Sequence, residues 1–432
     1  MSVGLVRLRV EADVLRGAAR DKGEDPGLVE LAVRLDAHRR EALAEVERLR
    51  AERKEISSQV GTAMKAGRAG ADVDELRGRS QAIGQRIEEG EETLRRLDAE
   101  LDEALLRIPN PADPDVPVGG EEASLIVRSW GQPLPRAADG WTRRPHWEVA
   151  EELGIFDLAG GAKVSGSGFP IYRGAGAALQ RALIDFMLAI HTTEHGMTEI
   201  WPPALVNEES ARGTGQIPDK EDQMYVVARD GLYLVPTAEV PVTNLHRDEI
   251  LEAARLPIRY VAYSPCFRRE AGAAGRQTRG ILRVHQFDKV EMVSFERPQE
   301  SSAALEWLTE RAEVILQRLG LAYRVKLMST REMGFVQAKK YDLEVWAPGV
   351  EEWLEVSSVS NFRDYQARRM NIRWRPAAGE RPEILHTLNG SGLALARTVA
   401  AILEVYQRAD AGMDMPAALS ARLGAELLPA LQ

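Results

Sequence analysis

In the first quarter of the chain, apolar side chains recur at helical spacing along two long segments. They stand mostly three, four or seven positions apart, with charged residues between them. The two stripes comprise Leu35, Ala42, Val46, Leu49, Ile56 and Val60, followed by Ile83, Ile87, Leu94, Leu97, Leu101, Leu105 and Ile108. Because the glycine-containing turn GRAGAD separates them, the pattern predicts an antiparallel coiled coil of two helices, each of roughly 35–40 residues and about 55–60 Å long.

A stripe this narrow cannot support a globular core, so we expect the hairpin to project from the body of the protein. A dimerisation coil or a rigid spacer would show the same pattern. The distal part, from Arg53 to Arg79, carries six basic and four acidic side chains. This slight basic excess is weak evidence for RNA binding.

Residues 109–120, PNPADPDVPVGG, interrupt the helical pattern with four prolines. Proline stiffens the chain and cannot continue a helix, so we predict a boundary between a hairpin domain, residues 1–110, and a second domain, residues 111–432. In the second domain, residues 176–196 and 391–407 have helical patterns, whereas residues 231–239, 282–295 and 341–348 have strand patterns. Without regular βαβ alternation, this order predicts an α+β fold with an antiparallel sheet.

Composition and charge narrow the class of protein further. The 432 residues are 44% hydrophobic and 28% charged, and no apolar run reaches the ~18–20 residues of a membrane span. We therefore expect no contact with membranes. A single cysteine excludes an internal disulfide and a cysteine-rich zinc site, so we expect no zinc and a cytoplasmic protein. The net charge of −10 argues against a general nucleic-acid coat, and no phosphate-binding P-loop or dinucleotide fingerprint is present.

The stretch CFRREAGAAGRQTRGILR, residues 266–283, raises the possibility of a phosphate site. It predicts two antiparallel strands joined by a glycine-rich loop, with Arg268 at the end of the first strand. Arginine holds a phosphate or a carboxylate through two hydrogen bonds. On the second strand, Phe287 and Glu291 share a face by period two, and the aromatic ring could stack on a base. A nucleotide site fits this set; a surface hairpin with a structural phenylalanine is the alternative.

Three further stretches carry candidate ligands. In PTAE, Thr237 and Glu239 are predicted on one face of a strand end, where they would hold an amine, unless the segment is an ordinary strand edge. In LEVSSVSN, Glu355 and Ser358 supply the oxygen ligands that Mg²⁺ prefers, unless the segment is a solvated turn. NGSGLALART is predicted as a glycine-rich turn that opens a helix, with Arg397 about two turns in. A charge on an apolar helix needs a partner, which is either an anionic ligand or a structural glutamate.

In this order, the motifs make the chain resemble the bacterial seryl-tRNA synthetases, a family of class II aminoacyl-tRNA synthetases. The three class II motifs are matched by HGMTEIWPPALV, with Pro203 as its proline, by CFRREAGAAGRQTRG with LRVHQFDKVEM, and by LNGSGLALARTVAAILE. Further matches are RGTGQIP, VPTAEVP, AKKYDLEVW and SNFRDYQARRM. The resemblance runs through essentially the whole chain, and the N-terminal hairpin resembles the tRNA-binding arm of the family.

The resemblance implies a class II antiparallel sheet flanked by helices and a two-step reaction. Serine and ATP would form seryl-adenylate, and the seryl group would pass to the 3′-terminal ribose of tRNA(Ser), with tRNA(Sec) as a further substrate. It also implies Mg²⁺ bound with ATP and a homodimer.

The resemblance also implies roles for individual residues. Arg268 would hold the α-phosphate beside the serine carboxylate, and Arg268, Arg397 and Glu355 would form the catalytic set. ATP would be bound by Arg268, Arg269, Glu270, Arg283, Val284, Phe287, Glu355, Val356, Ser357, Ser358 and Arg397. Serine would be bound by Thr237, Ala238, Glu239, Arg268, Glu291, Asn389 and Ser391, and Mg²⁺ by Glu355 and Ser358.

Some positions depart from the usual family pattern, among them Gly168, Arg331, Glu332 and Val359. They leave room for a divergent second copy that serves antibiotic resistance or biosynthesis. An amino acid ligase that loads a carrier protein is a further alternative, which the full-length arm disfavours. Within the loop of residues 272–280, we expect Arg276 and Arg279 to belong to a mobile cover over ATP. We expect Cys266 to be a packed strand residue.

Overall fold

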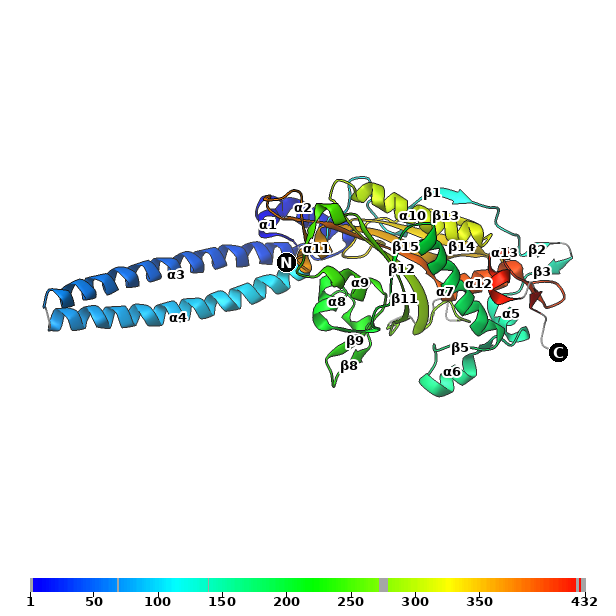
Figure 1. Cartoon of the computed structure of the whole chain (residues 1–432), viewed down its shortest axis with the longest axis horizontal. Helices are drawn as coiled ribbons and strands as arrows, with labels where there is room; N and C mark the ends of the chain where they lie inside the picture. Colours follow the sequence, from blue (N-terminus) through cyan, green and yellow to red (C-terminus); the bar gives the residue numbers. More distant parts are fainter. Residues whose placement is uncertain (1–2, 68–69, 139, 272–278, 425–426, 429–432) are drawn as a thin grey trace. The chain divides into compact units, whose positions relative to one another are not determined.

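The computed structural model of the chain describes residues 3–67, 70–138, 140–271, 279–424 and 427–428 (Figure 1). The chain divides into two compact units, Met1–Pro109 and Asn110–Gln432. Among the described residues, none of the helices is both long enough and apolar enough to cross a membrane. Arg276 and its neighbours in the predicted cover lie outside the described residues.

The first unit is helical, and its two long helices form the predicted hairpin. It contains α1 (Leu5–Val10), α2 (Ala12–Lys22), α3 (Gly27–Lys65) and α4 (Ala71–Leu106), with α3 and α4 side by side in Figure 1. Ion pairs join Arg50 to Glu91 at 2.7 Å and Glu45 to Arg86 at 2.8 Å, as antiparallel helices require. The prediction of two long helices that pair as a coiled coil is confirmed.

A narrow apolar seam holds this hairpin together. Its buried residues are Val46, Leu49, Ile56, Ile83 and Ile87. The helices approach closely at Gly90, where an added Cβ would lie only 2.6 Å from a methyl group of Val46. The seam is therefore a helix-pair contact rather than a globular core.

The second unit is built on an eight-stranded sheet with the order β1-β13-β14-β15-β18-β12-β11-β6. All its neighbouring strands are antiparallel except β11 and β6. The strands are β1 (Leu125–Trp130), β6 (Thr198–Ile200), β11 (Ile258–Phe267), β12 (Gln286–Glu296), β13 (Tyr323–Leu327), β14 (Lys339–Ala347), β15 (Glu352–Arg363) and β18 (His386–Ala394). The predicted α+β class is confirmed.

The two faces of the sheet pack against different helices. Val290 and Met292 of β12 belong to the main core, together with apolar residues of α7 (Ala175–Thr193), α10 (Ser301–Arg318) and α12 (Leu395–Tyr406). Val293 and Phe295 belong to a second cluster with α9 (Glu239–Thr243) and α11 (Tyr365–Arg369). Because successive side chains of a strand point to opposite faces, α9 and α11 lie across the sheet from the main core.

The remaining elements are short. The helices and turns are α5 (His146–Glu152), α6 (Leu158–Ser165), α8 (Glu208–Thr214), α13 (Ala417–Leu423), η1 (Glu121–Ala123), η2 (Glu221–Gln223), η3 (Asn244–His246) and η4 (Ala253–Arg255). The strands are β2 (Ala137–Ala138), β3 (Trp141–Thr142), β4 (Phe156–Asp157), β5 (Ile171–Tyr172), β7 (Leu205–Asn207), β8 (Val226–Val227), β9 (Leu232–Leu234), β10 (Ile250–Glu252), β16 (Arg373–Arg375), β17 (Glu383–Ile384), β19 (Met413–Asp414) and β20 (Leu427–Leu428).

Two local predictions are wrong. The strand expected over residues 231–239 ends at Leu234, and Glu239 instead begins the short helix α9. The predicted turn NGSG lies inside the central strand β18, so α12 begins only at Leu395, and Arg397 stands in its first turn. Pairing of β18 with both β12 and β15 explains this, because neighbouring strands supply the hydrogen bonds that a local glycine-rich pattern cannot reveal.

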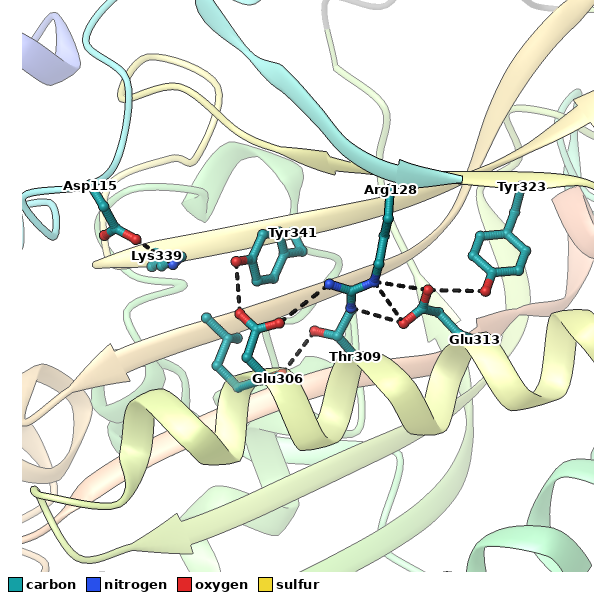
Figure 2. A network of polar contacts seen from close by, with 9 residues as sticks. Asp115, Arg128, Glu306, Thr309, Glu313, Tyr323, Lys339 and Tyr341 are labelled. Carbon is teal, nitrogen blue, oxygen red and sulfur yellow. Dashed lines mark hydrogen bonds and ion pairs between the residues drawn. The ribbon is translucent and has the colours of Figure 1, made fainter. Parts of the chain in front are cut away.

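A polar network fixes α10 to the edge of the sheet (Figure 2). The guanidinium of Arg128 on β1 lies 2.8 Å from Glu313 and 3.4 Å from Glu306. The hydroxyls of Tyr323 and Tyr341 donate to the same two carboxylates at 3.0 Å and 2.7 Å. The carboxylate of Glu313 therefore stays paired although its side chain is only 9% exposed.

We expect the substitution Arg128→Ala to lower the free energy of unfolding by about 2 kcal/mol, because Glu313 loses its guanidinium partner. Urea unfolding of the full chain measures this loss. Arg136→Ala is a matched control, since Arg136 pairs with Glu351 at 3.5 Å with both side chains about half exposed. It should cost less than about 0.5 kcal/mol. Equal losses in the two variants would contradict a buried anchoring role for Arg128.

Candidate active site

A cleft of about 430 Å³ opens on the sheet face that carries α9 and α11. Its walls come from β12, β14, β15 and β18, from the segments that follow β9 and β11, and from the first turn of α12. The predicted site residues that line it are Thr237, Glu239, Arg268, Glu270, Arg283, Val284, Phe287, Glu291, Glu355, Val356, Ser357, Ser358, Asn389, Ser391 and Arg397. One cavity thus brings together residues spread over about 160 positions of the chain.

Strand alternation places these side chains. On β12, Phe287, Lys289 and Glu291 line the cleft, whereas Val290 and Met292 face the helices. On β18, an irregularity in the pairing with β12 falls at Gly392. It lets Asn389 and Ser391 reach the cleft although Leu393 belongs to the core.

Two of the predicted residues do not line the cleft. The guanidinium of Arg269 donates to the carbonyl oxygen of Asp222 at 3.0 Å, and its backbone N–H donates to Gln223 at 2.8 Å. Ala238 is fully buried in the apolar cluster under α9. Without a ligand, both residues therefore face protein groups.

Arg268 and Phe287 form one side of the cleft. The backbone N–H of Arg268 donates to His285 at 2.9 Å, which fixes the residue directly after β11. Its guanidinium carbon lies 5.1 Å from the centre of the Phe287 ring. A cation above an aromatic face is attracted to it, so Phe287 holds the guanidinium in place.

Glu270 and Arg283 form an ion pair across the mouth of the glycine-rich loop. The Arg283 Nε lies 2.5 Å from Glu270 Oε2, and Glu270 has a positive φ of 50°. This conformation is costly for a residue with a side chain, so the surrounding contacts hold it. Both groups line the cleft, and a bound anion or amine would compete with their pairing.

Arg397, a charged residue on an otherwise apolar helix, pairs with a glutamate of the protein, Glu355. Its Nη1 donates to the Glu355 carbonyl oxygen at 2.9 Å and lies 3.6 Å from the carboxylate. Desolvation opposes ionisation of Glu355, but the charges of Lys340 and Arg397 outweigh it and lower the pKa of Glu355. Glu355 is therefore an ionised carboxylate beside two cationic side chains, and its oxygens can bind a metal ion.

Lys340 and Asp342 lie under this end of the cleft. The Lys340 Nζ is 3.1 Å from Asp342 Oδ2, and Asp342 faces Ser358 across the β14–β15 pair. Burial raises the pKa of Asp342, while the ammonium of Lys340 and the nearby hydroxyl of Ser358 oppose the rise. Neither charged residue was among the predicted contacts, although both lie in the stretch AKKYDLEVW.

The other end of the cleft holds two buried carboxylates. Glu239 accepts a hydrogen bond from Gln366 Nε2 at 2.7 Å, and Glu291 lies 2.6 Å from the Lys289 ammonium. Ser391 donates to Glu291 at 3.2 Å. Burial, helped by the negative charge of Glu291, raises the pKa of Glu239 to about 7. This end is suited to a small ligand that carries an ammonium group.

Lys289 is a cleft residue that the sequence could have indicated. Its ammonium donates to Thr237 Oγ1 at 2.7 Å, so it joins Thr237 to Glu291. Lys289 stands midway between Phe287 and Glu291, and the period-two argument that selected those two residues also selects it. Gln366 carried no comparable signal, because α11 reaches Glu239 only through the fold.

Cys266 is fully buried in β11, and burial raises the pKa of its thiol. A buried, protonated thiol is a poor nucleophile, in agreement with the packing role expected. Among the described residues of the glycine-rich loop, Arg279 lies over the ring of Trp147 at 5.4 Å.

Comparison with known proteins identifies the family. A model of the seryl-tRNA synthetase N-terminal domain matches residues 5–112, and one of the tRNA synthetase class II core domain (G, H, P, S and T) matches residues 225–406. The chain is 50% identical over 424 residues to the serine–tRNA ligase of Gemmatimonas aurantiaca, and 98% of each chain is covered. The chain belongs to the seryl-tRNA synthetase family.

Solved structures agree with this assignment to the seryl-tRNA synthetases. The seryl-tRNA synthetase of Pyrococcus horikoshii, complexed with ATP, matches with a TM-score of 0.93 and 37% identity over 99% of this chain and 100% of that one. The cytoplasmic serine–tRNA ligase of Naegleria fowleri, in complex with AMP, matches with a TM-score of 0.85 and 28% identity over 98% and 96%. The expected class II fold is confirmed, whereas the readings as a divergent copy or a carrier-protein ligase gain no support.

One departure from the family pattern has a structural explanation. Gly168 has a φ of 84°, and an added Cβ would lie 2.3 Å from the ring of His285. The backbone N–H of His285 donates to the Gly168 carbonyl oxygen at 2.8 Å. A side chain at this position would collide with the segment that leads into β12, so glycine fits this version of the family fold.

The raised pKa of Glu239 predicts how stability depends on pH in the absence of ligands. Between its usual value of about 4.3 and about 7, the folded protein binds more protons here than the unfolded chain, so the unfolding free energy falls as the pH rises. We expect Glu239→Gln to remove this loss and to stabilise the protein by up to about 3 kcal/mol at pH 8, with little effect at pH 4.

Urea unfolding of both proteins across this pH range measures the difference. The exposed residue Glu383 offers the matched control Glu383→Gln. A pH-independent effect of Glu239→Gln would contradict the raised pKa.

Proposed function

We propose that this chain activates L-serine with ATP and transfers the seryl group to tRNA(Ser). The observation that carries the proposal is the division of a single cleft. Glu355 and Arg397 pair at one end, Glu239 and Glu291 lie together at the other, and Arg268 also lines the cleft. The first set suits a polyphosphate with its cation, and the second suits the ammonium and hydroxyl groups of serine. The activity of the relatives supports the same assignment.

In the first step, a carboxylate oxygen of serine attacks the α-phosphorus of ATP. The new P–O bond forms as the bond to the bridging oxygen breaks, and pyrophosphate leaves. In the second step, the terminal ribose hydroxyl of the tRNA, the 3′ hydroxyl in class II enzymes, attacks the seryl carbonyl and AMP leaves. Neither step requires a covalent bond to the protein, so positioning and charge stabilisation do most of the work.

Arg268 stands between the two ends of the cleft and would hold the α-phosphate beside the serine carboxylate. One face of its guanidinium lies over the Phe287 ring. The opposite face is left for a base or a phosphate. Glu270 would meet the exocyclic amine of adenine, and Arg283 and Arg397 the outer phosphates. Val284, Val356 and Ser357 would line the nucleotide. We assign Arg269 to the support of the loop stem, because its side chain faces Asp222.

For serine, the carboxylates of Glu239 and Glu291 would face the ammonium and the hydroxyl. Thr237, Asn389 and Ser391 complete the pocket as polar neighbours. Alanine would leave a buried acceptor without a partner, which typically penalises the wrong substrate strongly. Threonine would add a methyl group to an already filled pocket.

The donor set at the phosphate end fits a hard cation. Glu355 and Ser358 present a carboxylate and a hydroxyl on β15, and the carboxylate of Asp342 lies behind them. We propose that Glu355 and Ser358 hold the Mg²⁺ that enters with ATP. The cation would supply charge neutralisation at the phosphates, while Glu355 and Ser358 orient it.

We further propose that the enzyme is a cytoplasmic homodimer and that the α3–α4 hairpin binds tRNA(Ser), with tRNA(Sec) as a further substrate. The hairpin would contact the backbone and shape of the RNA more than its base sequence. For the dimer, the support is an exposed apolar side chain within the segment that matches the first class II motif. Trp201, next to β6, is 80% exposed.

We expect Arg268→Ala to lower kcat/KM for serine-dependent ATP–pyrophosphate exchange by at least ~10²-fold, because one cation serves both reacting groups. Arg268→Lys should recover only part of the loss, since an ammonium cannot make the bidentate contact. The exposed Arg229 supplies the control Arg229→Ala, which should behave as the wild type. Exchange at the wild-type rate in Arg268→Ala would exclude this role.

The proposed tRNA-binding role of the hairpin can be separated from catalysis. Val46 and Gly90 face each other across the seam, so a short glycine-serine turn can replace residues 48–88. We expect this variant to retain ATP–pyrophosphate exchange within about 2-fold and to lose at least ~10²-fold in charging of tRNA(Ser) with labelled serine. Normal charging would contradict the arm assignment, whereas exchange without charging in the intact protein would contradict the proposed function.

A further inference from the structure

Asp342 on β14 is a buried carboxylate with half of its acceptor capacity unused. The residue is 3% exposed, and its Oδ2 lies 3.1 Å from the Lys340 ammonium. Its Oδ1 has no hydrogen-bond partner among the residues that the structure describes. Buried polar atoms are nearly always paired, so an unpaired carboxylate oxygen beside a ligand cleft calls for an explanation.

The strand register directs this carboxylate towards the proposed cation site. Asp342 stands directly opposite Ser358 of β15, and opposed residues of an antiparallel pair point to the same face. Lys339 and Tyr341 point to the other face. There Tyr341 donates to Glu306 of α10, and Lys339 lies 2.6 Å from Asp115 (Figure 2). These contacts hold β14 from behind, so Asp342 remains on the cleft side.

A hydroxyl group that binds a cation must turn a lone pair towards it and its proton away. Coordination also makes the hydroxyl a stronger donor, so a correctly placed acceptor fixes its orientation. The unpaired Oδ1 of Asp342 is an acceptor on the same face as the Ser358 hydroxyl. The Lys340 ammonium lies 3.1 Å from the other oxygen, so Oδ1 is the acceptor that remains open.

We propose that Asp342 is a positioning residue for the cation that enters with ATP. Its Oδ1 accepts a hydrogen bond from the Ser358 hydroxyl and thereby directs the Ser358 oxygen at the metal, while Lys340 holds Oδ2. This inference rests on the proposed function, because it assumes that Ser358 is a ligand of the cation. A purely structural Lys340–Asp342 pair would instead stabilise the sheet and act independently of Ser358.

The test is a double-mutant cycle on Mn²⁺ binding, measured by electron paramagnetic resonance on the full chain with a non-hydrolysable ATP analogue. In Asp342→Asn, Lys340 selects the amide oxygen, so the amide NH₂ faces Ser358 and can no longer accept its proton. We expect Asp342→Asn and Ser358→Ala each to weaken Mn²⁺ binding at least tenfold. The double variant should be no weaker than Ser358→Ala alone.

Two outcomes overturn the inference: an Asp342→Asn variant that binds Mn²⁺ as the wild type does, and a double variant whose losses simply add. Failure of the proposed function looks different, because Ser358→Ala would then bind Mn²⁺ normally. Binding of the ATP analogue in the presence of EDTA, which removes the metal ion, shows whether each variant is folded. If Asp342→Asn does not fold, the pair Asp342→Leu with Lys340→Met, which leaves neither an unpaired ammonium nor an acceptor beside Ser358, must show the same loss. The exposed Asp230 provides the control Asp230→Asn.

Discussion

The alternation of side chains across the central antiparallel strands is the constraint on which both the core and the cleft depend. On β12, Val290 and Met292 pack with three helices in the main core, whereas Phe287, Lys289 and Glu291 line the cleft and Val293 and Phe295 join the cluster on its side of the sheet. A shift of one residue would exchange the two sets and place Lys289 and Glu291 in the apolar core. The position of the site is therefore coupled to the stability of the fold, and the contacts of Arg128 behind the sheet also help to hold the cleft strands.

Within the cleft, opposite charges are paired before any ligand arrives. Glu270 with Arg283, Glu355 with Arg397, and Glu291 with Lys289 each reduce the cost of holding ionised groups in a partly desolvated site. A ligand that carries both phosphates and an ammonium exchanges these internal pairs for its own. Glu239 differs, because burial raises its pKa and the negative charge of Glu291 adds to the rise.

Sequence reasoning succeeded at the site where local periodicity controls the geometry. The placement of Arg268 directly after a strand, and of Phe287 and Glu291 on one face, followed from strand patterns alone. It failed where long-range pairing overrides local preference, as for NGSG inside β18 and for PTAE, which enters a helix. Glycine and proline are typical of turns, but a central strand between two partners accepts glycine when the register requires a bulge.

The sequence by itself determined the helical hairpin, the α+β class and the family, because heptad spacing, strand periodicity and ordered motifs are properties of neighbouring residues. Only the tertiary structure decided which charged side chains meet. Asp342 and Ser358 are 16 positions apart, yet they stand opposite each other on β14 and β15, and Gln366 is 127 positions from Glu239, yet it donates a hydrogen bond to it. Such contacts depend on sheet order and register, which arise when distant segments bury their apolar faces together.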